Sequence, residues 1–156
     1  FSGRDATILA AILGATVLVG FSEELVFRGI VLPAYLQNTS AAKAVLISSF
    51  LFSIFHVVNI LGGVSVQASA IQLLNALLLG ITFGFIAVEM GRIWPLMIFH
   101  AAYDFFLIAG GYAEADTQNN SIFGAIFAGA FGVVMLAITL YSDRTKKSAG
   151  ELQTAE

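Results

Sequence analysis

Long apolar stretches, separated by short polar segments, occupy most of the chain. A helix needs about 20 mostly apolar residues to cross a bilayer. Five stretches meet or approach this length, at about residues 6–22, 44–60, 69–90, 93–111 and 121–142. Segment 24–36 reads as a helical continuation of the first stretch, and Pro33 predicts a break near its end. The pattern predicts an all-α fold, a polytopic transmembrane helical bundle with about five spans in this sequence.

Polar or glycine-containing segments predict the turns between these stretches. They are Gln37-Asn38-Thr39-Ser40, Gly62-Gly63, Gly91-Arg92 and the acidic, amide-rich segment from Tyr112 to Asn120. The polar C-terminal segment predicts a disordered tail. We find no internal repeat, and we therefore expect one transmembrane domain over residues 1–142 and a polar cytoplasmic tail over residues 143–156.

The composition agrees with a membrane location. The chain is 58% hydrophobic and 11% charged, whereas soluble domains have about 25% charged residues. It contains no cysteine, which excludes disulfides and thiolate metal sites. The net charge of −3 gives no indication of a nucleic-acid partner, so the lipid bilayer is the expected environment.

Lysine and arginine positions predict the orientation, because basic residues accumulate on the cytoplasmic side. With the N-terminus outside, five spans leave only Arg4 outside, and the cytoplasmic side receives Arg28, Lys43, Arg92, Arg144, Lys146 and Lys147. The first apolar stretch leads directly into two glutamates without a small-residue cleavage site, unlike a signal peptide. Since the sequence begins at Phe1, we expect a fragment of a longer integral membrane protein.

Five ionisable residues lie within the apolar stretches and need an explanation. They are Glu23, Glu24, His56, His100 and Asp104. A charge at the bilayer centre costs at least about 2.5–3.5 kcal/mol, so such residues normally face protein or a water-filled cavity.

Glu24 and Arg28 are four residues apart, which places them on one helix face in the favoured order. Glu23 points about 100° away from Glu24 and is therefore available for other contacts. Burial in an apolar pocket favours the neutral form of an unpaired carboxylate, which suits a general base. An interfacial helix end closed by a salt bridge explains the segment equally well.

The two histidines of the chain lie on separate predicted helices. His56 follows Phe52 by one turn, and His100 shares a face with Asp104. Each could be a packing residue or a structural pair. Two imidazoles and several carboxylates converging in lipid would instead indicate chemistry with water or proton transfer.

Together these segments resemble the CAAX protease and bacteriocin-processing (Abi) family of intramembrane glutamate endopeptidases, over about residues 10–106. The family pattern is Glu-Glu-x-x-x-Arg, then Phe-x-x-x-His, then His-x-x-x-Asn or Asp. The matching residues are Glu23, Glu24 and Arg28, then Phe52 and His56, then His100 and Asp104.

The resemblance implies a role for each matched residue. Glu23 would activate a water for attack on a peptide carbonyl, and His56 would hold that water or the developing charge. His100 and Asp104 would lie around the oxyanion, with Glu24 and Arg28 in support. Better-known members have Asn in place of Asp104, and an ionised Asp cannot donate a hydrogen bond. An orienting contact with His100 is therefore the favoured role for Asp104.

The resemblance implies hydrolysis of a membrane-bound or lipidated peptide, in the cytoplasmic half of a prokaryotic plasma membrane. It also permits a non-catalytic protein, such as a bacteriocin self-immunity factor or a partner scaffold. Intramembrane carboxylates and histidines also occur in proton-coupled transporters, although the small size and absence of repeats disfavour this class. Two histidines and a carboxylate could bind zinc, but we expect no metal cofactor.

One geometric difficulty follows from the predicted topology. The helices over residues 44–60 and 93–111 run in the same direction, and His56 lies farther from its helix start than His100 does. The offset is about 8 Å along the axis at about 1.5 Å per residue. Tilt, or a second helix that begins deeper in the membrane, would have to remove it.

Overall fold

The computed structural model describes residues 3–113, and all regular elements in this range are helices. In chain order they are α1 (Gly3–Glu24), η1 (Leu25–Val31), α2 (Leu32–Leu36), α3 (Ala41–Phe55), α4 (Val58–Leu61), α5 (Val66–Met90) and α6 (Trp94–Ala113). The predicted all-α class is confirmed. The predicted span 121–142 and the tail lie outside the described residues.

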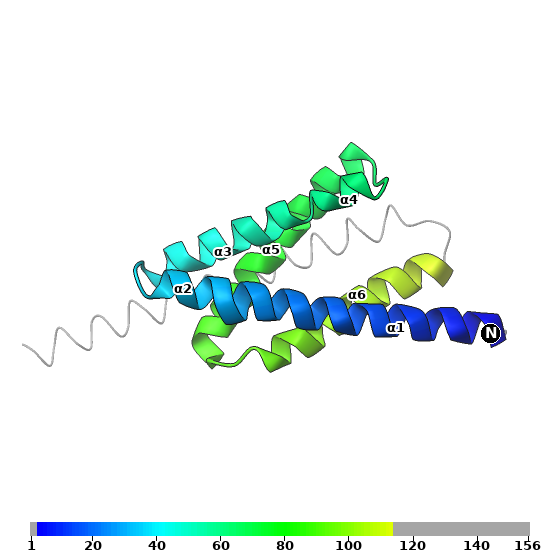
Figure 1. Ribbon diagram of the computed structural model, residues 1–156, viewed down its shortest axis with the longest axis horizontal. Coiled ribbons are helices and arrows are strands. Elements are labelled where there is room, and N and C mark those ends of the chain that lie inside the picture. The colour runs from blue at the N-terminus through cyan, green and yellow to red at the C-terminus, as the bar shows by residue number, and fades with distance from the viewer. Residues whose placement is uncertain (1–2, 114–156) are drawn as a thin grey trace, which may run out of the picture.

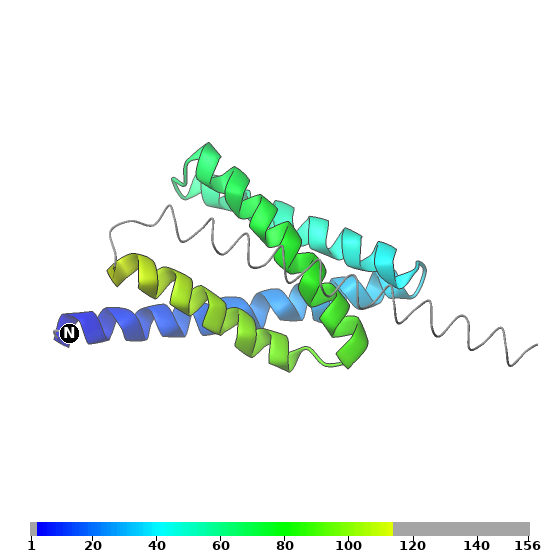
Figure 2. The ribbon, with the colours of Figure 1, turned by 180° about the vertical axis from the view of Figure 1, so that it is seen from behind.

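The helices form two packed pairs. Helix α1 lies beside α6, and α3 lies beside α5, as Figures 1 and 2 show from opposite sides. The π-helix η1 contacts both α3 and α5, while α2 contacts α3. Because η1 and α2 continue α1, this first helical rod joins the two pairs.

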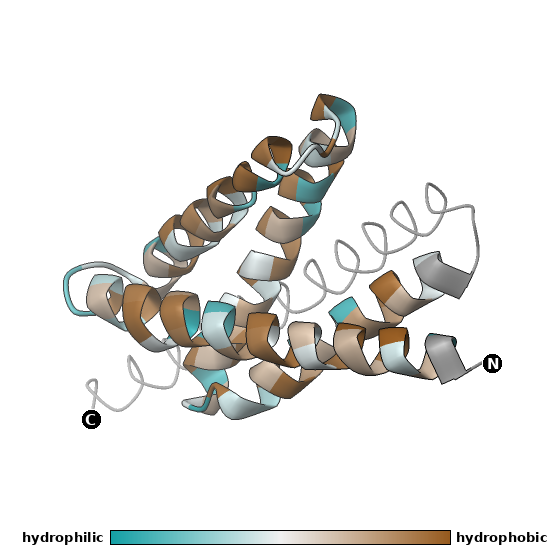
Figure 3. Ribbon diagram, turned by 45° about the vertical axis from the view of Figure 1, so that its right-hand side comes forward, coloured by the Kyte–Doolittle hydropathy of each residue, from teal (hydrophilic) through white to brown (hydrophobic). Residues whose placement is uncertain are grey.

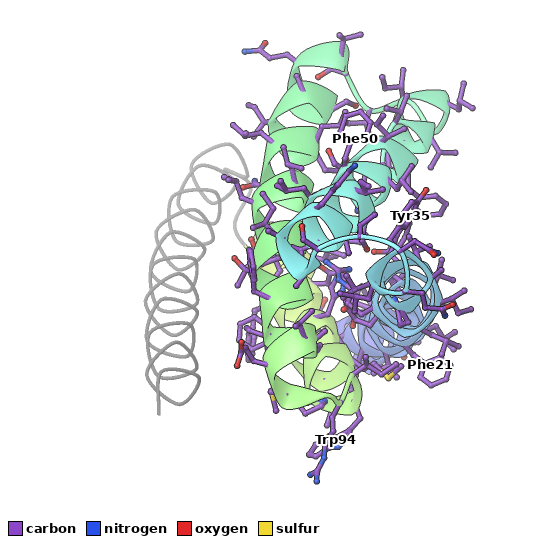
Figure 4. The ribbon with its side chains drawn as sticks, turned by 90° about the vertical axis from the view of Figure 1, so that its left-hand side faces the viewer. Phe21, Tyr35, Phe50 and Trp94 are labelled. Carbon is purple, nitrogen blue, oxygen red and sulfur yellow. The ribbon has the colours of Figure 1, made fainter. Side chains whose placement is uncertain are left out.

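Three helical stretches of the described chain are long and apolar enough to cross a membrane: Asp5–Leu36, Ala41–Leu61 and Val66–Met90. They confirm the polytopic transmembrane bundle. Helix α6, which carries His100 and Asp104, is not among the three. Large apolar side chains face outward on all of these helices, and Figure 4 shows Phe21 and Trp94 pointing away from the bundle. An outward apolar surface of this kind suits contact with lipid.

The predicted turns up to Arg92 are confirmed. Ser40 and Ser65 cap the N-termini of α3 and α5 by accepting hydrogen bonds from backbone N–H groups. Gly91 ends α5 in the left-handed conformation, with φ of 61°, where a residue without Cβ is favoured.

The expected break near Pro33 is wrong. The chain stays helical past Pro33 to Leu36. Pro33 lies in the first turn of α2, where the wider turns of η1 give way to an α-helix, and an absent N–H is tolerated at such a position. The stretch predicted over 44–60 lies within the helical stretch Ala41–Leu61, in which α3 ends at Phe55 and a short α4 follows.

Candidate active site

A buried carboxylate, Glu24, holds together groups from two helices. Its Oε1 accepts hydrogen bonds from Arg28 Nη1 at 2.9 Å and from His100 Nδ1 at 2.8 Å. All three side chains are almost inaccessible to solvent. Buried charges are tolerated when they are paired and hydrogen-bonded. The predicted pairing of Glu24 with Arg28 is therefore confirmed, and the same carboxylate fixes α6 to the end of α1.

Arg28 extends this cluster to the second pair of helices. Its Nη2 donates a hydrogen bond to Gly80 O on α5 at 3.2 Å, and its guanidinium lies 4.4 Å from the ring centroid of Phe52 on α3. A planar guanidinium with several donors suits such combined pairing and stacking. Arg28 thus connects η1 with both α3 and α5.

His56 owes its orientation to the end of α3. Its backbone N–H donates to Ser53 O, so Phe52 O does not receive the usual helical hydrogen bond from this residue. The His56 ring takes that place, with Nδ1 2.9 Å from Phe52 O. Because a carbonyl can only accept, Nδ1 carries the proton, and Nε2 of the neutral ring keeps a lone pair.

Glu23 faces both imidazole rings. Its Oε2 lies 3.8 Å from His100 Nε2 and 4.0 Å from His56 Nε2, distances that exceed a direct hydrogen bond. Oε2 is buried and has no hydrogen-bond partner within the described part of the chain. The structure therefore brings together the three residues that the sequence motifs singled out. The gaps between them suit groups bridged by a water.

The offset expected between the two histidines does not separate them. Helices α3 and α6 run in the same direction, as predicted, but Figure 1 shows α6 beginning farther along that direction. A helix start deeper in the bundle was one of the two ways in which the offset could be removed.

Asp104 lies on the cavity side of His100. Its Oδ2 is 3.5 Å from His100 Nε2, and its side chain is about a quarter exposed. The sequence favoured Asp104 as the group that orients His100. In the structure the ring donates its short hydrogen bond to Glu24, which lies 76 residues away in the sequence and was expected to pair with Arg28.

A cavity of about 750 Å³ contains these side chains at one end. Apolar residues of α1, α3, α5 and α6 form much of its wall, and an additional polar part was missed by sequence reasoning: Asn59, Gln67, Gln72 and Asn75. Figure 3 shows hydrophilic positions along the first half of α5. Gln72 and Asn75 are three residues apart in an apolar helix and therefore share one face. That spacing was the sequence signal from which the polar part of the wall could have been predicted.

The cavity extends from Glu23 toward the end of the bundle that carries α4. No residue of the turns at 37–40 or 91–92 lines it. The basic-residue rule places those two turns in the cytoplasm and α4 outside. Under this rule the cavity extends from Glu23 toward the outer side, and the orientation stays a prediction.

The described residues offer no ready metal site. No group of three His, Cys, Asp or Glu side chains among them is arranged to hold a metal ion. No metal-dependent step is derived for this site, and the expectation of a metal-free reaction stays a prediction.

Most of the described chain matches a known protein family. Residues 5–106, more than half of the chain, match the family described as type II CAAX prenyl endopeptidase Rce1-like. The chain belongs to this family. No curated protein and no solved structure matches it. Membership in a family of membrane endopeptidases, together with the spanning helices, makes the chain an integral membrane protein, and Glu23, His56 and His100 all lie within the matched region.

Proposed function

We propose that the chain is an intramembrane peptidase that hydrolyses a membrane-bound or lipidated peptide, with Glu23 activating the attacking water. The observation that carries this proposal is the unequal environment of the two imidazoles facing Glu23. His56 Nδ1 meets a neutral carbonyl, whereas His100 Nδ1 meets the carboxylate of Glu24. These partners suit His56 Nε2 to accept a hydrogen bond and His100 Nε2 to donate one.

His56 is suited to hold the water. With its proton on Nδ1, Nε2 accepts a hydrogen bond from a water that lies between it and Glu23 Oε2. Glu23 then takes a proton from this water as its oxygen attacks the peptide carbonyl carbon. When the C–N bond breaks, the proton passes from Glu23 to the leaving amine.

His100 is suited to stabilise the oxyanion. A carboxylate on Nδ1 favours an imidazolium, as in other hydrolases, so that Nε2–H can donate to developing negative charge. Charge balance supports this form, because the carboxylates of Glu23 and Glu24 face one guanidinium. Asp104, next to Nε2, acts at the same oxyanion when its carboxyl is protonated.

The decisive test is Glu23→Gln, which preserves shape and removes the base. Loss of a general base lowers the rate by about 10²- to 10⁴-fold. We expect membrane-protein termini that are present in cells with the native protein to disappear in cells with the variant. A proteome-wide comparison of N- and C-termini measures this. Identical termini, with an unchanged cellular phenotype, would instead support the non-catalytic immunity or scaffold role.

We further propose that the reaction needs no metal. Cleavage by the purified protein in liposomes should then survive prolonged dialysis against a zinc chelator. Loss of cleavage that returns on addition of Zn²⁺ would contradict this part of the proposal.

A further inference from the structure

Two amide side chains form a hydrogen-bonded pair in the wall of the cavity. Asn59 Nδ2 on α4 donates to Gln72 Oε1 on α5 at 3.0 Å, and both residues are half-buried. Both line the same cavity as Glu23 and His56. Asn59 follows His56 by three residues, so the pair lies close to the ring that we assign to the attacking water.

The pair leaves one donor and one acceptor for a ligand. Asn59 Oδ1 and Gln72 Nε2 form no hydrogen bond with another described residue. Neither atom is among the fully buried unpaired polar atoms of the described residues, so both are open to a ligand that can hydrogen-bond to them. The needed ligand presents an N–H and a C=O side by side.

An extended peptide has this arrangement on each edge. In an antiparallel ladder, the N–H and C=O of one residue point the same way and engage one partner. One residue of an extended peptide can therefore donate its N–H to Asn59 Oδ1 and accept from Gln72 Nε2. A prenyl or acyl chain alone offers no such groups.

We propose that Asn59 and Gln72 bind the backbone of an extended substrate peptide and place its scissile carbonyl against the water at Glu23. The inference rests on the proposed peptidase function and adds the backbone conformation of the substrate and two binding residues. The neighbouring junction of α3 and α5 has its own hydrogen bond, from Ser53 Oγ to Leu73 O at 2.7 Å, so the amide pair is not needed to join those two helices.

Binding can be measured without turnover. The full chain carrying Glu23→Gln is purified in nanodiscs, and the probe is a fluorescent S-farnesylated peptide that ends in a CAAX sequence. We expect Gln72→Leu to weaken probe binding about tenfold. Gln37→Leu is the matched control, since Gln37 is an exposed amide outside the cavity, and it should leave affinity unchanged within twofold. Equal affinities of the two variants, or no binding of the probe by the parent protein, would overturn the inference.

A second series separates binding from packing. Each backbone N–H of the probe is methylated in turn, which removes one donor at a time. At one position, methylation should weaken binding about tenfold to the parent protein but less than twofold to Asn59→Leu, because the lost contact is already absent there. Equal losses in both proteins at every position would assign the pair to packing. Cleavage by wild-type protein is read separately, so failure of the peptidase proposal and failure of this inference remain distinguishable.

Discussion

Gly20 offers a test of how precisely the site must be assembled. On α1, this glycine faces α6 so closely that an added Cβ would lie 2.7 Å from Ala101 N and 2.9 Å from Met97 O. Both atoms belong to the backbone and cannot rotate away. Ordinary contacts of a Cβ begin at 3.4 Å, so Gly20→Ala must move the helices apart by 3.4 − 2.7 = 0.7 Å at this point.

The hydrogen bond between Glu24 and His100 crosses the same interface, one helical turn from Gly20 and next to Ala101. Lengthening its 2.8 Å by a comparable amount brings it to about 3.5 Å, where a hydrogen bond is essentially lost. His100 would then shift relative to Glu23. A displacement near 1 Å in a catalytic constellation lowers the rate by about 100-fold. Overpacking also costs about 1–3 kcal/mol of stability.

The assay is the initial rate of peptide cleavage in proteoliposomes, divided by the amount of folded protein measured by thermal unfolding. Gly14→Ala is the matched control, because it lies on the same helix with nothing within 4 Å of the added Cβ. It should keep the native rate and stability. A folded Gly20→Ala protein with a rate within threefold of native would refute the claim that the α1–α6 spacing positions His100.

Three further outcomes follow from the described contacts. Arg28→Met leaves the buried carboxylate of Glu24 without its guanidinium partner and should lower the free energy of unfolding, measured by denaturant titration, by about 3 kcal/mol. The control Lys43→Met removes an exposed cation and should change this free energy by less than about 0.5 kcal/mol. Asp104→Asn keeps a donor beside the oxyanion and should retain cleavage within about threefold, while Asp104→Ala should lose about 100-fold; equal losses would remove the donor role. Since the chain has no cysteine, Leu61→Cys and Asn38→Cys provide single labels at opposite ends, and an impermeant maleimide applied to intact cells should react with Leu61→Cys alone.

Interactions between residues that are close in the sequence allowed much of the helical framework to be predicted. The apolar stretches, the capped turns and the pairing of Glu24 with Arg28 depend on residues close together in the sequence. The separation of Glu23 from that pair follows from the 100° step of a helix. These predictions hold because neighbouring residues determine them before any tertiary contact forms.

The remaining features depend on packing between distant segments. Glu24 orients His100 only because Gly20 lets α1 approach α6 closely. The orientation of His56 depends on where α3 ends, and no proline or glycine marks that point. The amide pair of Asn59 and Gln72 requires α4 to fold against α5. A hydrophobic pattern predicts that helices will pack, but not which residues meet.

The position of the cavity has a consequence for where substrate enters. The described residues that line the cavity continue from Glu23 toward α4 and the start of α5, so we expect a peptide to approach from that end of the bundle. Exposed Lys43 and Arg92 lie at the other end, and the basic-residue rule assigns that end to the cytoplasm. Under this rule we expect the substrate to approach from the outer leaflet. Labelling at Asn38→Cys alone in intact cells would reverse the assignment and return the cavity mouth to the cytoplasmic leaflet. One topological measurement therefore tests on which side of the membrane the α4 end of the cavity lies, whichever peptide the proposed peptidase cuts.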